Sequence, residues 1–511
     1  MKKHIKYLFT LLGVITLLSA CSDELDLAPV SSLSDASYWK TPDQFDAFVT
    51  GVHTSFRSHT SNFQRLGEMR SDIFGTETPL GPTFTGEATQ GVERMWLQTL
   101  DANDAGVSNF GGFYFNINQL NLLINKLTTT EVVTAANKNY YLGIAYGMRA
   151  YYYFHLVRSW GKVVLQTDPV FAIDVSSLAK PASSEEEVMK QIKADIESSA
   201  SSFGNDYTFR NSKGFWSKAA TLMLKAEVYL WTSYRGGGAA DATMAKNALT
   251  DIQTNIPSLA LQASFANVFS AGNKGNSEII FAIRYLLNEA TMGYVPGSFT
   301  PQTGLIINFY DSLQNRKFDV GTDNWGGLLR APVKVSTFRM YDNSDSRKWA
   351  TIQPAYSKVG ANYVIAGAFV KKFQGEQNAG SRQYTNDFPV YRHADLLLLL
   401  AEAKVILGED PATEINKVRQ RAFGANYVPL IHGYPNQAVD ANPKEAILRE
   451  RLLEFIFEGK RWYDLRRMGD NFVYKYTTLT PDQSYKLLWP IDRTSLTNNR
   501  SLEQNPGYPK F

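Results

Sequence analysis

Cysteine is nearly absent from this 511-residue chain, in which Cys21 is the only one. An intrachain disulfide, a zinc site built from thiolates and a CxxC redox pair are therefore excluded. An excess of one charge is also lacking, because 52 Lys and Arg residues stand against 49 Asp and Glu residues. Nucleic-acid-binding proteins carry a large basic excess, so the composition argues against that class.

The common catalytic motifs are missing as well. The sequence has neither a GxSxG elbow nor a P-loop. None of its six histidines belongs to an HExxH motif. A glycoside hydrolase would need two carboxylates facing each other across a cleft, and the sequence marks no such pair. We therefore expect a protein that is not an enzyme and has no cofactor. A calcium ion held by loop oxygens stays open, although no EF-hand pattern is present.

Long apolar runs are missing beyond the N-terminus, where Leu396–Ala401, for example, has only six residues. A membrane span needs about 20. The N-terminus itself carries Lys2, Lys3 and Lys6 and then an uncharged apolar stretch, which is typical of a secretory signal peptide. We expect residues 1–20 to be that signal peptide.

The run Leu18-Ser19-Ala20-Cys21 follows this apolar stretch. It resembles a bacterial lipobox, in which the signal peptide is cut before the Cys and the thiol is lipidated. We expect residues 21–40 to be the lipidated Cys21 and a linker, with the acyl chains anchoring the protein to the outer membrane. The acidic residues between positions 23 and 26 resemble the surface-export signal of Bacteroidetes lipoproteins, so we expect exposure at the cell surface.

Helix signals dominate the two ends of the chain. Thr41-Pro42-Asp43-Gln44 and Ser183-Ser184-Glu185-Glu186 are typical helix starts. Helical spacing of apolar residues predicts further helices over 113–127, 138–160, 215–235, 388–407, 411–422 and 443–468. Three segments, MRAYYYFHL, LKAEVYLWT and LLLAEAKVIL, share a loose pattern of Ala with aromatic or Leu residues, which hints at stacked helix pairs of the tetratricopeptide kind.

The middle of the chain has a different character. Residues 261–385 are rich in Gly, Asn, Ser, Thr and aromatics, and the runs EIIFAIRY and YVIAGAFVKKF within them predict strands. We predict a helical region at 41–260 with binding loops at 60–112, a loop-rich region at 261–385, and a second helical region at 386–511 that completes the scaffold.

Six blocks along nearly the whole chain carry a family resemblance. They are the lipobox with YWKTPDQFDAFVTGVHTSF, YLGIAYGMRAYYYFHLVRSWGKV, FPVYRHADLLLLLAEA, INKVRQRA, ERLLEFIFEGKRWYDLRRMG and LLWPIDRTSLTNNRSLEQNPGY. In this order they resemble the SusD/RagB family of outer-membrane nutrient-binding lipoproteins. One small departure is Met468, which stands where the family often has a second Trp.

The resemblance implies a mainly α-helical fold, in which tetratricopeptide-like helix pairs form a scaffold and a loop-rich lobe with short strands packs on it. It implies a partner, a SusC-like TonB-dependent β-barrel transporter, to which the lipoprotein would deliver a captured oligosaccharide. The family is not catalytic. A member that binds peptides or another nutrient is the alternative, and a lipid-anchored glycoside hydrolase is a remote one.

The block RWYDLRR places Asp464 among three Arg residues, which could be mistaken for an active site. We expect instead ion pairs that join helices, because the Arg guanidinium suits bidentate pairing with carboxylates. We expect the same structural role for Arg392 and Glu402.

A sugar site needs flat aromatic faces that stack on a pyranose ring, with amides, carboxylates and Arg nearby to bond the hydroxyls. The candidate aromatics stand in loops and are Trp96, Tyr294 and Trp325. Their candidate polar neighbours are Arg94, Asn103, Asp323 and Asn324. We expect the glycines that flank Trp325 to make a projecting, exposed loop.

Overall fold

The computed structural model describes residues 38–77, 84, 90–171 and 179–510. The predicted signal peptide, Cys21 and the linker up to residue 37 lie outside the described residues. None of the helices in the described ranges is long and apolar enough to cross a membrane.

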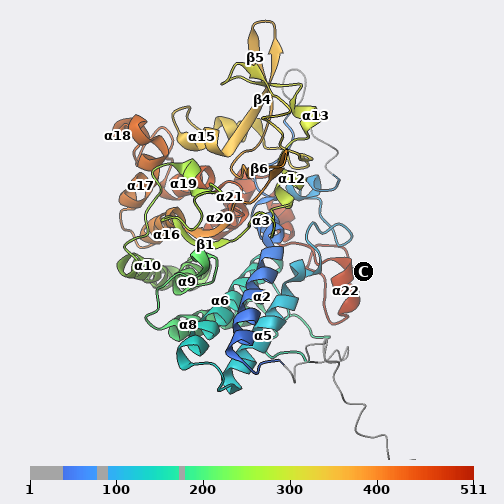
Figure 1. The fold of residues 1–511 in the computed structure, drawn as a ribbon, viewed down its shortest axis with the longest axis vertical. Helices are drawn as coiled ribbons and strands as arrows, with labels where there is room; N and C mark the ends of the chain where they lie inside the picture. Colours follow the sequence, from blue (N-terminus) through green and yellow to red (C-terminus); the bar gives the residue numbers. More distant parts are fainter. Residues whose placement is uncertain (1–37, 78–83, 85–89, 172–178, 511) are drawn as a thin grey trace, which may run out of the picture.

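Long helices form a scaffold in which neighbours in the chain also lie side by side (Figure 1). They are α2 (Pro42–Ser58), α3 (Thr60–Glu68), α5 (Phe113–Thr129), α6 (Ala135–Trp160), α8 (Glu185–Phe203), α9 (Lys218–Thr232), α10 (Gly238–Asn255), α16 (His393–Ile406), α17 (Ala412–Phe423), α19 (Pro443–Phe455), α20 (Arg461–Met468) and α21 (Asp470–Tyr476). α5 packs on α6, α6 on α8, α9 on α10 and α16 on α17. The predicted scaffold of tetratricopeptide-like helix pairs is confirmed.

Local signals in the sequence explain where these helices begin. α2 starts at Pro42, and Thr41 and Gln44 form a reciprocal capping box in front of it. α8 follows the same rule with Ser184 and Glu187. Each box satisfies backbone N–H groups that the first turn of a helix leaves unpaired.

The loop-rich lobe carries the strands and most of the short helices. β1 (Ile279–Ile283) pairs antiparallel with β8 (Phe388–Arg392). A second, antiparallel sheet has the order β3-β2-β4-β5, with β2 (Tyr310–Asp311), β3 (Arg316–Lys317), β4 (Ile352–Val359) and β5 (Asn362–Val370). β6 (Glu376–Asn378) and β7 (Ser381–Gln383) form a small hairpin. The short helices are α4 (Glu93–Trp96), α11 (Phe265–Val268), α12 (Tyr294–Ser298), α13 (Thr303–Ile306), α14 (Val335–Arg339), α15 (Ser346–Thr351), α18 (Pro429–His432) and α22 (Arg493–Asn498).

Two of the predicted helices differ from the structure. The prediction over 388–407 was wrong in its first five residues, because FPVYR forms β8 and pairs with β1 before α16 begins. The prediction of one helix over 443–468 was also wrong, since α19 ends at Phe455 and α20 starts at Arg461. Phe457 (φ 72°) and Gly459 (φ 73°) between them adopt left-handed backbone conformations that no continuous helix allows.

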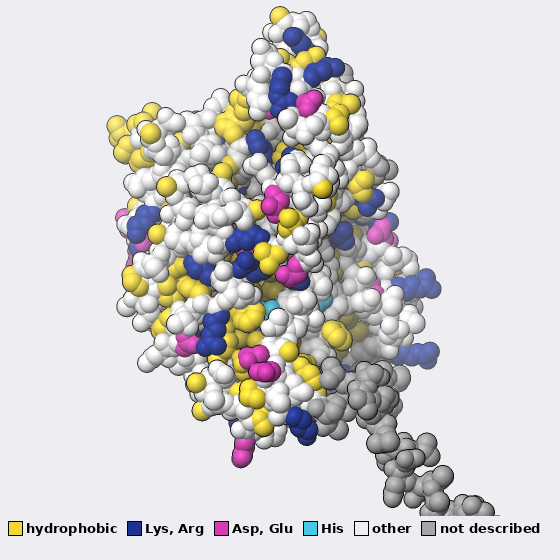
Figure 2. All heavy atoms as spheres, in the orientation of Figure 1, with side chains coloured by type: hydrophobic (Ala, Val, Ile, Leu, Met, Phe, Trp, Pro, Cys, Tyr) yellow, Lys and Arg dark blue, Asp and Glu magenta, His cyan; other side chains and the backbone are white. Residues whose placement is uncertain are grey.

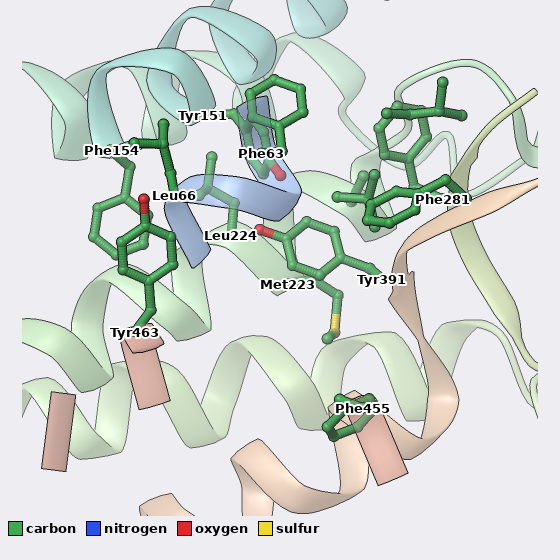
Figure 3. Close-up of a cluster of buried hydrophobic side chains, with 14 of the residues drawn as sticks. Phe63, Leu66, Tyr151, Phe154, Met223, Leu224, Phe281, Tyr391, Phe455 and Tyr463 are labelled. Atoms are coloured by element: carbon green, nitrogen blue, oxygen red, sulfur yellow. The ribbon is translucent and has the colours of Figure 1, made fainter. Parts of the chain in front are cut away.

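The main hydrophobic core lies where elements from both ends of the chain meet. Figure 3 shows Phe63 of α3, Tyr151 of α6 and Tyr391 of β8 in one cluster. The Phe63 and Tyr151 rings are 5.3 Å apart and meet edge to face. A second, smaller core lies in the loop-rich lobe. The scaffold therefore supports that lobe through contacts between residues that are far apart in the sequence.

Buried ion pairs join the C-terminal helices, as predicted for the RWYDLRR block. Asp395 of α16 bonds Arg451 of α19 at 2.8 Å and Lys460 at 2.7 Å. Arg467 of α20 bonds both Glu402 and Asp464 at 2.8 Å. These side chains are buried, so the block holds helices together.

The Asp395 pair makes stability depend on pH. Burial alone would raise the pKa of Asp395, but the positive charges of Lys460 and Arg451 outweigh it and lower that pKa to about 2. A carboxylate with a depressed folded-state pKa stabilises the fold above its unfolded pKa and loses this contribution as the pH falls. We expect the free energy of unfolding to fall by about 2 kcal/mol through this group between pH 5 and pH 2. Chemical denaturation over that range checks this, and Asp395→Asn must then show a shallower pH dependence than the wild type.

One surface patch is unusually apolar. Val428, Leu430 and Ile431 at α18 are 42%, 95% and 60% exposed. Figure 2 shows hydrophobic side chains gathered at the upper left, where Figure 1 places α18.

Candidate ligand-binding surfaces

Trp325 is packed inside the second core. Its side chain is 6% exposed, the Phe369 ring meets it edge to face at 5.2 Å, and the Arg382 guanidinium lies 4.4 Å from its centroid. The expectation of a projecting Trp ring is therefore not met. The reason is that β5 and the β6–β7 hairpin close around the loop and cover the ring.

The polar residues next to Trp325 form a hydrogen-bonded surface over this core. Arg316 binds the Asp323 carboxylate at 2.5 and 3.1 Å. Asn324 accepts a hydrogen bond from the Thr303 hydroxyl at 2.8 Å, and its carbonyl oxygen accepts one from Arg382 at 2.9 Å. We call Arg316, Asp323, Asn324 and Arg382 the Asn324 surface.

Trp96 is also buried, at 8% exposure, as part of the main core. The polar residues on either side of it in the sequence form a compact turn. Arg94 bonds the carboxylates of Asp101 at 2.7 Å and Asp104 at 3.3 Å. Asn103 is exposed, and its side-chain oxygen accepts a hydrogen bond from Arg493 at 3.4 Å. We call Arg94, Asp101, Asn103 and Asp104 the Asn103 turn.

Tyr294 of α12 serves as a packing residue. Its ring meets those of Phe299 and Phe388 edge to face, at 6.3 and 6.5 Å. Burial raises the pKa of its hydroxyl well above the ordinary value. The ring is half-buried, and its hydroxyl contacts the Met292 sulfur at 3.7 Å.

One carboxylate on each surface, Asp323 and Asp101, has a lowered pKa. Burial tends to raise the pKa of Asp323, but hydrogen bonds from Arg316 and from a backbone N–H outweigh it, and the pKa lies below its ordinary value. The pKa of Asp101 is lowered in the same way, against burial, by the backbone N–H groups of Asn103 and Asp104 and by Arg94. Both carboxylates are therefore hydrogen-bond acceptors at neutral pH.

The structure brings together four of the predicted residues as two pairs, and it adds partners that the sequence did not reveal. Asp323 and Asn324 share the Asn324 surface, while Arg94 and Asn103 share the Asn103 turn. Arg382 was missed because it stands far along the chain and reaches Trp325 only through the β6–β7 hairpin. Within the described ranges, no group of three or more His, Cys, Asp or Glu side chains is arranged to hold a metal ion.

Two family models match this chain. Residues 336–508 match the model described as the SusD family, and residues 46–230 match the model described as starch-binding associating with outer membrane. The first runs from α14 to beyond α22, and the second runs from within α2 to within α9. Together they take in both ends of the helical scaffold.

Solved structures agree over almost the full length. B. fragilis NanU is 44% identical, has a TM-score of 0.87 and covers 95% of this chain and 100% of its own. A SusD superfamily protein from Bacteroides vulgatus is 42% identical, has a TM-score of 0.84 and covers 92% of this chain and 100% of its own. A sequence relative, SusD-like protein P38 of Formosa agariphila, is 27% identical over 99% of both chains. The chain belongs to the SusD family.

Proposed function

We propose that this protein captures an oligosaccharide nutrient at the cell surface and delivers it to a SusC-like TonB-dependent outer-membrane transporter. The observation that carries the proposal is the match of residues 46–230 to a family described as starch-binding and associated with the outer membrane. The fold supports it, because a rigid helical scaffold presents loop surfaces rich in hydrogen-bonding side chains, and such surfaces are where binding residues concentrate.

The protein works by capture and release, without bond cleavage. A glycoside hydrolase needs a carboxylic acid with a raised pKa that protonates the leaving group. The pKa values of Asp101 and Asp323 are instead lowered by their Arg and backbone partners. These carboxylates are suited to accepting hydrogen bonds from sugar hydroxyls.

The N-terminal segment would determine where the protein is located in the cell. A lipid on Cys21 would anchor the protein to the outer membrane, and the acidic linker would let it extend from the surface. The transporter would then close with the lipoprotein around the captured glycan. Co-purification from native outer membranes must yield a TonB-dependent β-barrel, and recovery of the lipoprotein alone would contradict this partner.

Calorimetry of the mature protein against plant, host and microbial oligosaccharides tests the function. A detergent without a sugar headgroup avoids competition for the site. We expect a heat of binding with one class of glycan. If no glycan gives a heat of binding and peptides do, the proposal is replaced by the peptide-binding alternative.

Asn324→Ala tests the binding surface. We expect it to weaken glycan binding about threefold to tenfold, because each lost hydrogen bond contributes roughly 0.5–1.5 kcal/mol. Asn139→Ala is the matched control, since Asn139 is exposed on α6, away from this surface. If Asn324→Ala binds glycan as tightly as the wild type and Asn103→Ala binds it more weakly, the binding site is at the Asn103 turn. Trp325→Ala is not a clean test, because it would open a cavity in the second core.

A further inference from the structure

A cavity of about 440 Å³ lies between the start of α5, residues 164–170 with Lys180, and α22, and none of its described lining residues belongs to the Asn324 surface or the Asn103 turn. Its lining residues are Asn109, Phe110, Tyr114, Phe115, Asn118, Val164, Gln166, Val170, Lys180, Ser495, Asn498, Asn499 and Leu502. Its volume is within the range of small-molecule sites, roughly 300–1,000 Å³. Three parts of the chain that are distant in sequence meet there.

Hydrogen bonds hold the walls of the cavity in place. Asn118 accepts from the Val170 N–H at 2.7 Å and donates to the Val170 carbonyl at 3.3 Å. The Tyr114 hydroxyl donates to the carbonyl of Val164 at 2.8 Å. Asn499 donates to the backbone carbonyl of Lys180 at 2.8 Å, which ties α22 to the opposite wall. A site fixed in this way loses little conformational freedom when a ligand binds.

Four of the lining residues offer groups to a ligand. The Phe115 side chain is 65% exposed, although Phe113, Ile117 and Leu120 of the same helix are buried. The side-chain amides of Asn109 and Asn498 have no hydrogen-bond partner among the residues that the structure describes. The Lys180 ammonium donates to Gln166 at 2.5 Å, has no ion pair with a carboxylate of the described chain, and keeps further N–H donors.

We propose that this cavity is a second carbohydrate site, which takes one pyranose ring of an oligosaccharide. It rests on the carbohydrate-binding role proposed above, but it uses different residues. The apolar face of the sugar lies on Phe115, while Asn109, Asn498 and Lys180 bond its hydroxyls. A ring with both an apolar face and a polar rim satisfies both kinds of lining at once.

The lining also distinguishes among ligands. None of the described residues on it is Asp or Glu, whereas Lys180 is a cation, so the described lining offers a cationic ligand no counter-ion. A fatty acyl chain offers no hydrogen-bonding group to the exposed amides of Asn109 and Asn498, and covering them without partners would be costly. A neutral pyranose avoids both costs.

The test uses methyl pyranosides of glucose, galactose and mannose as probes, with the mature full chain in a detergent without a sugar headgroup. Saturation-transfer NMR and calorimetry measure binding. We expect the wild type to bind at least one of the three, and Phe115→Ala to weaken it about tenfold. Phe115→Tyr should retain binding because it keeps the flat ring. Leu430→Ala, at a residue 95% exposed on α18, is the control and should bind like the wild type.

The outcomes separate this proposal from the general function. Binding of an oligosaccharide but of no methyl pyranoside overturns the second site and leaves the function standing. Binding of neither overturns both. Equal affinity of wild type and Phe115→Ala also overturns the second site, as does binding of palmitate in place of the sugars. Loss of methyl pyranoside binding in Phe115→Ala, with that binding unchanged in Asn324→Ala, supports the cavity.

Discussion

Replacing Arg392 with Ala is expected to lower the free energy of unfolding by about 3–5 kcal/mol. Arg392 ends β8, is fully buried, and bonds Glu278, Glu454 and Glu458 at 2.7, 2.6 and 2.8 Å. Removing it leaves three buried carboxylates with one positive partner fewer. The penalty comes mostly from those uncompensated charges and less from the lost attraction itself.

This loss is large against the total stability of a typical domain, about 5–15 kcal/mol. Urea unfolding of the wild type, Arg392→Ala and Arg392→Lys measures it. The Lys variant keeps the charge but loses the bidentate geometry, so we expect it to lie between the other two. If Arg392→Ala lowers the free energy of unfolding by less than 1 kcal/mol, the ion pairs of Arg392 with its three Glu partners do not hold β8 and α19 together.

The matched control is a surface ion pair. Lys246 bonds Glu409 at 2.6 Å, but their side chains are 32% and 40% exposed. Pairs of this kind contribute roughly 0–1 kcal/mol, because water screens them and holding two long side chains costs entropy. Lys246→Ala should therefore be close to neutral. The contrast compares a buried cation that bonds three carboxylates with an exposed cation that bonds one at a similar distance.

The helical scaffold could be predicted from the sequence because its signals are local. The Thr41 capping box and the apolar spacing from Phe113 onward are read from neighbours within a few residues. The limits appear where tertiary contacts compete with local propensity. The run at 388–392 fits a helix pattern by itself, but its pairing with β1, more than 100 residues earlier in the chain, makes it a strand.

The binding surfaces were less predictable. Loop position suggested that Trp96 and Trp325 were exposed, yet both rings fill cores. A Trp followed by glycines has the same local sequence whether its ring projects into solvent or packs in a core. The burial of the Trp325 ring depends on the folding of β5 and the β6–β7 hairpin over it, which are distant in the sequence. Phe115 shows the reverse case. It stands off the apolar stripe of Ile117, Leu120 and Leu127, and that outward position was the one local signal of the cavity.

Gly67→Ala is expected to destabilise the protein by about 3 kcal/mol or more. Gly67 belongs to α3, and a Cβ there would lie 1.7 Å from the carbonyl oxygen of Gly459 and 2.5 Å from its carbonyl carbon. The α3 backbone fixes the position of this Cβ and the atoms that it meets are backbone atoms, so no side-chain rotation relieves the contact. Next to this contact, the Glu68 carboxylate accepts hydrogen bonds from the N–H groups of Phe457 (2.6 Å) and Gly459 (3.2 Å).

Gly51→Ala is the opposite case and makes the control. Gly51 is exposed within α2, and a Cβ there would meet nothing within 4 Å. Ala in an exposed helix interior is favoured over Gly by about 1 kcal/mol, so this variant should be more stable than the wild type. Urea unfolding of both variants separates close packing from helix propensity. A neutral Gly67→Ala would mean that α3 can move away from the 456–460 segment. In that case the close packing of α3 would not be required for the conformation of the segment between α19 and α20.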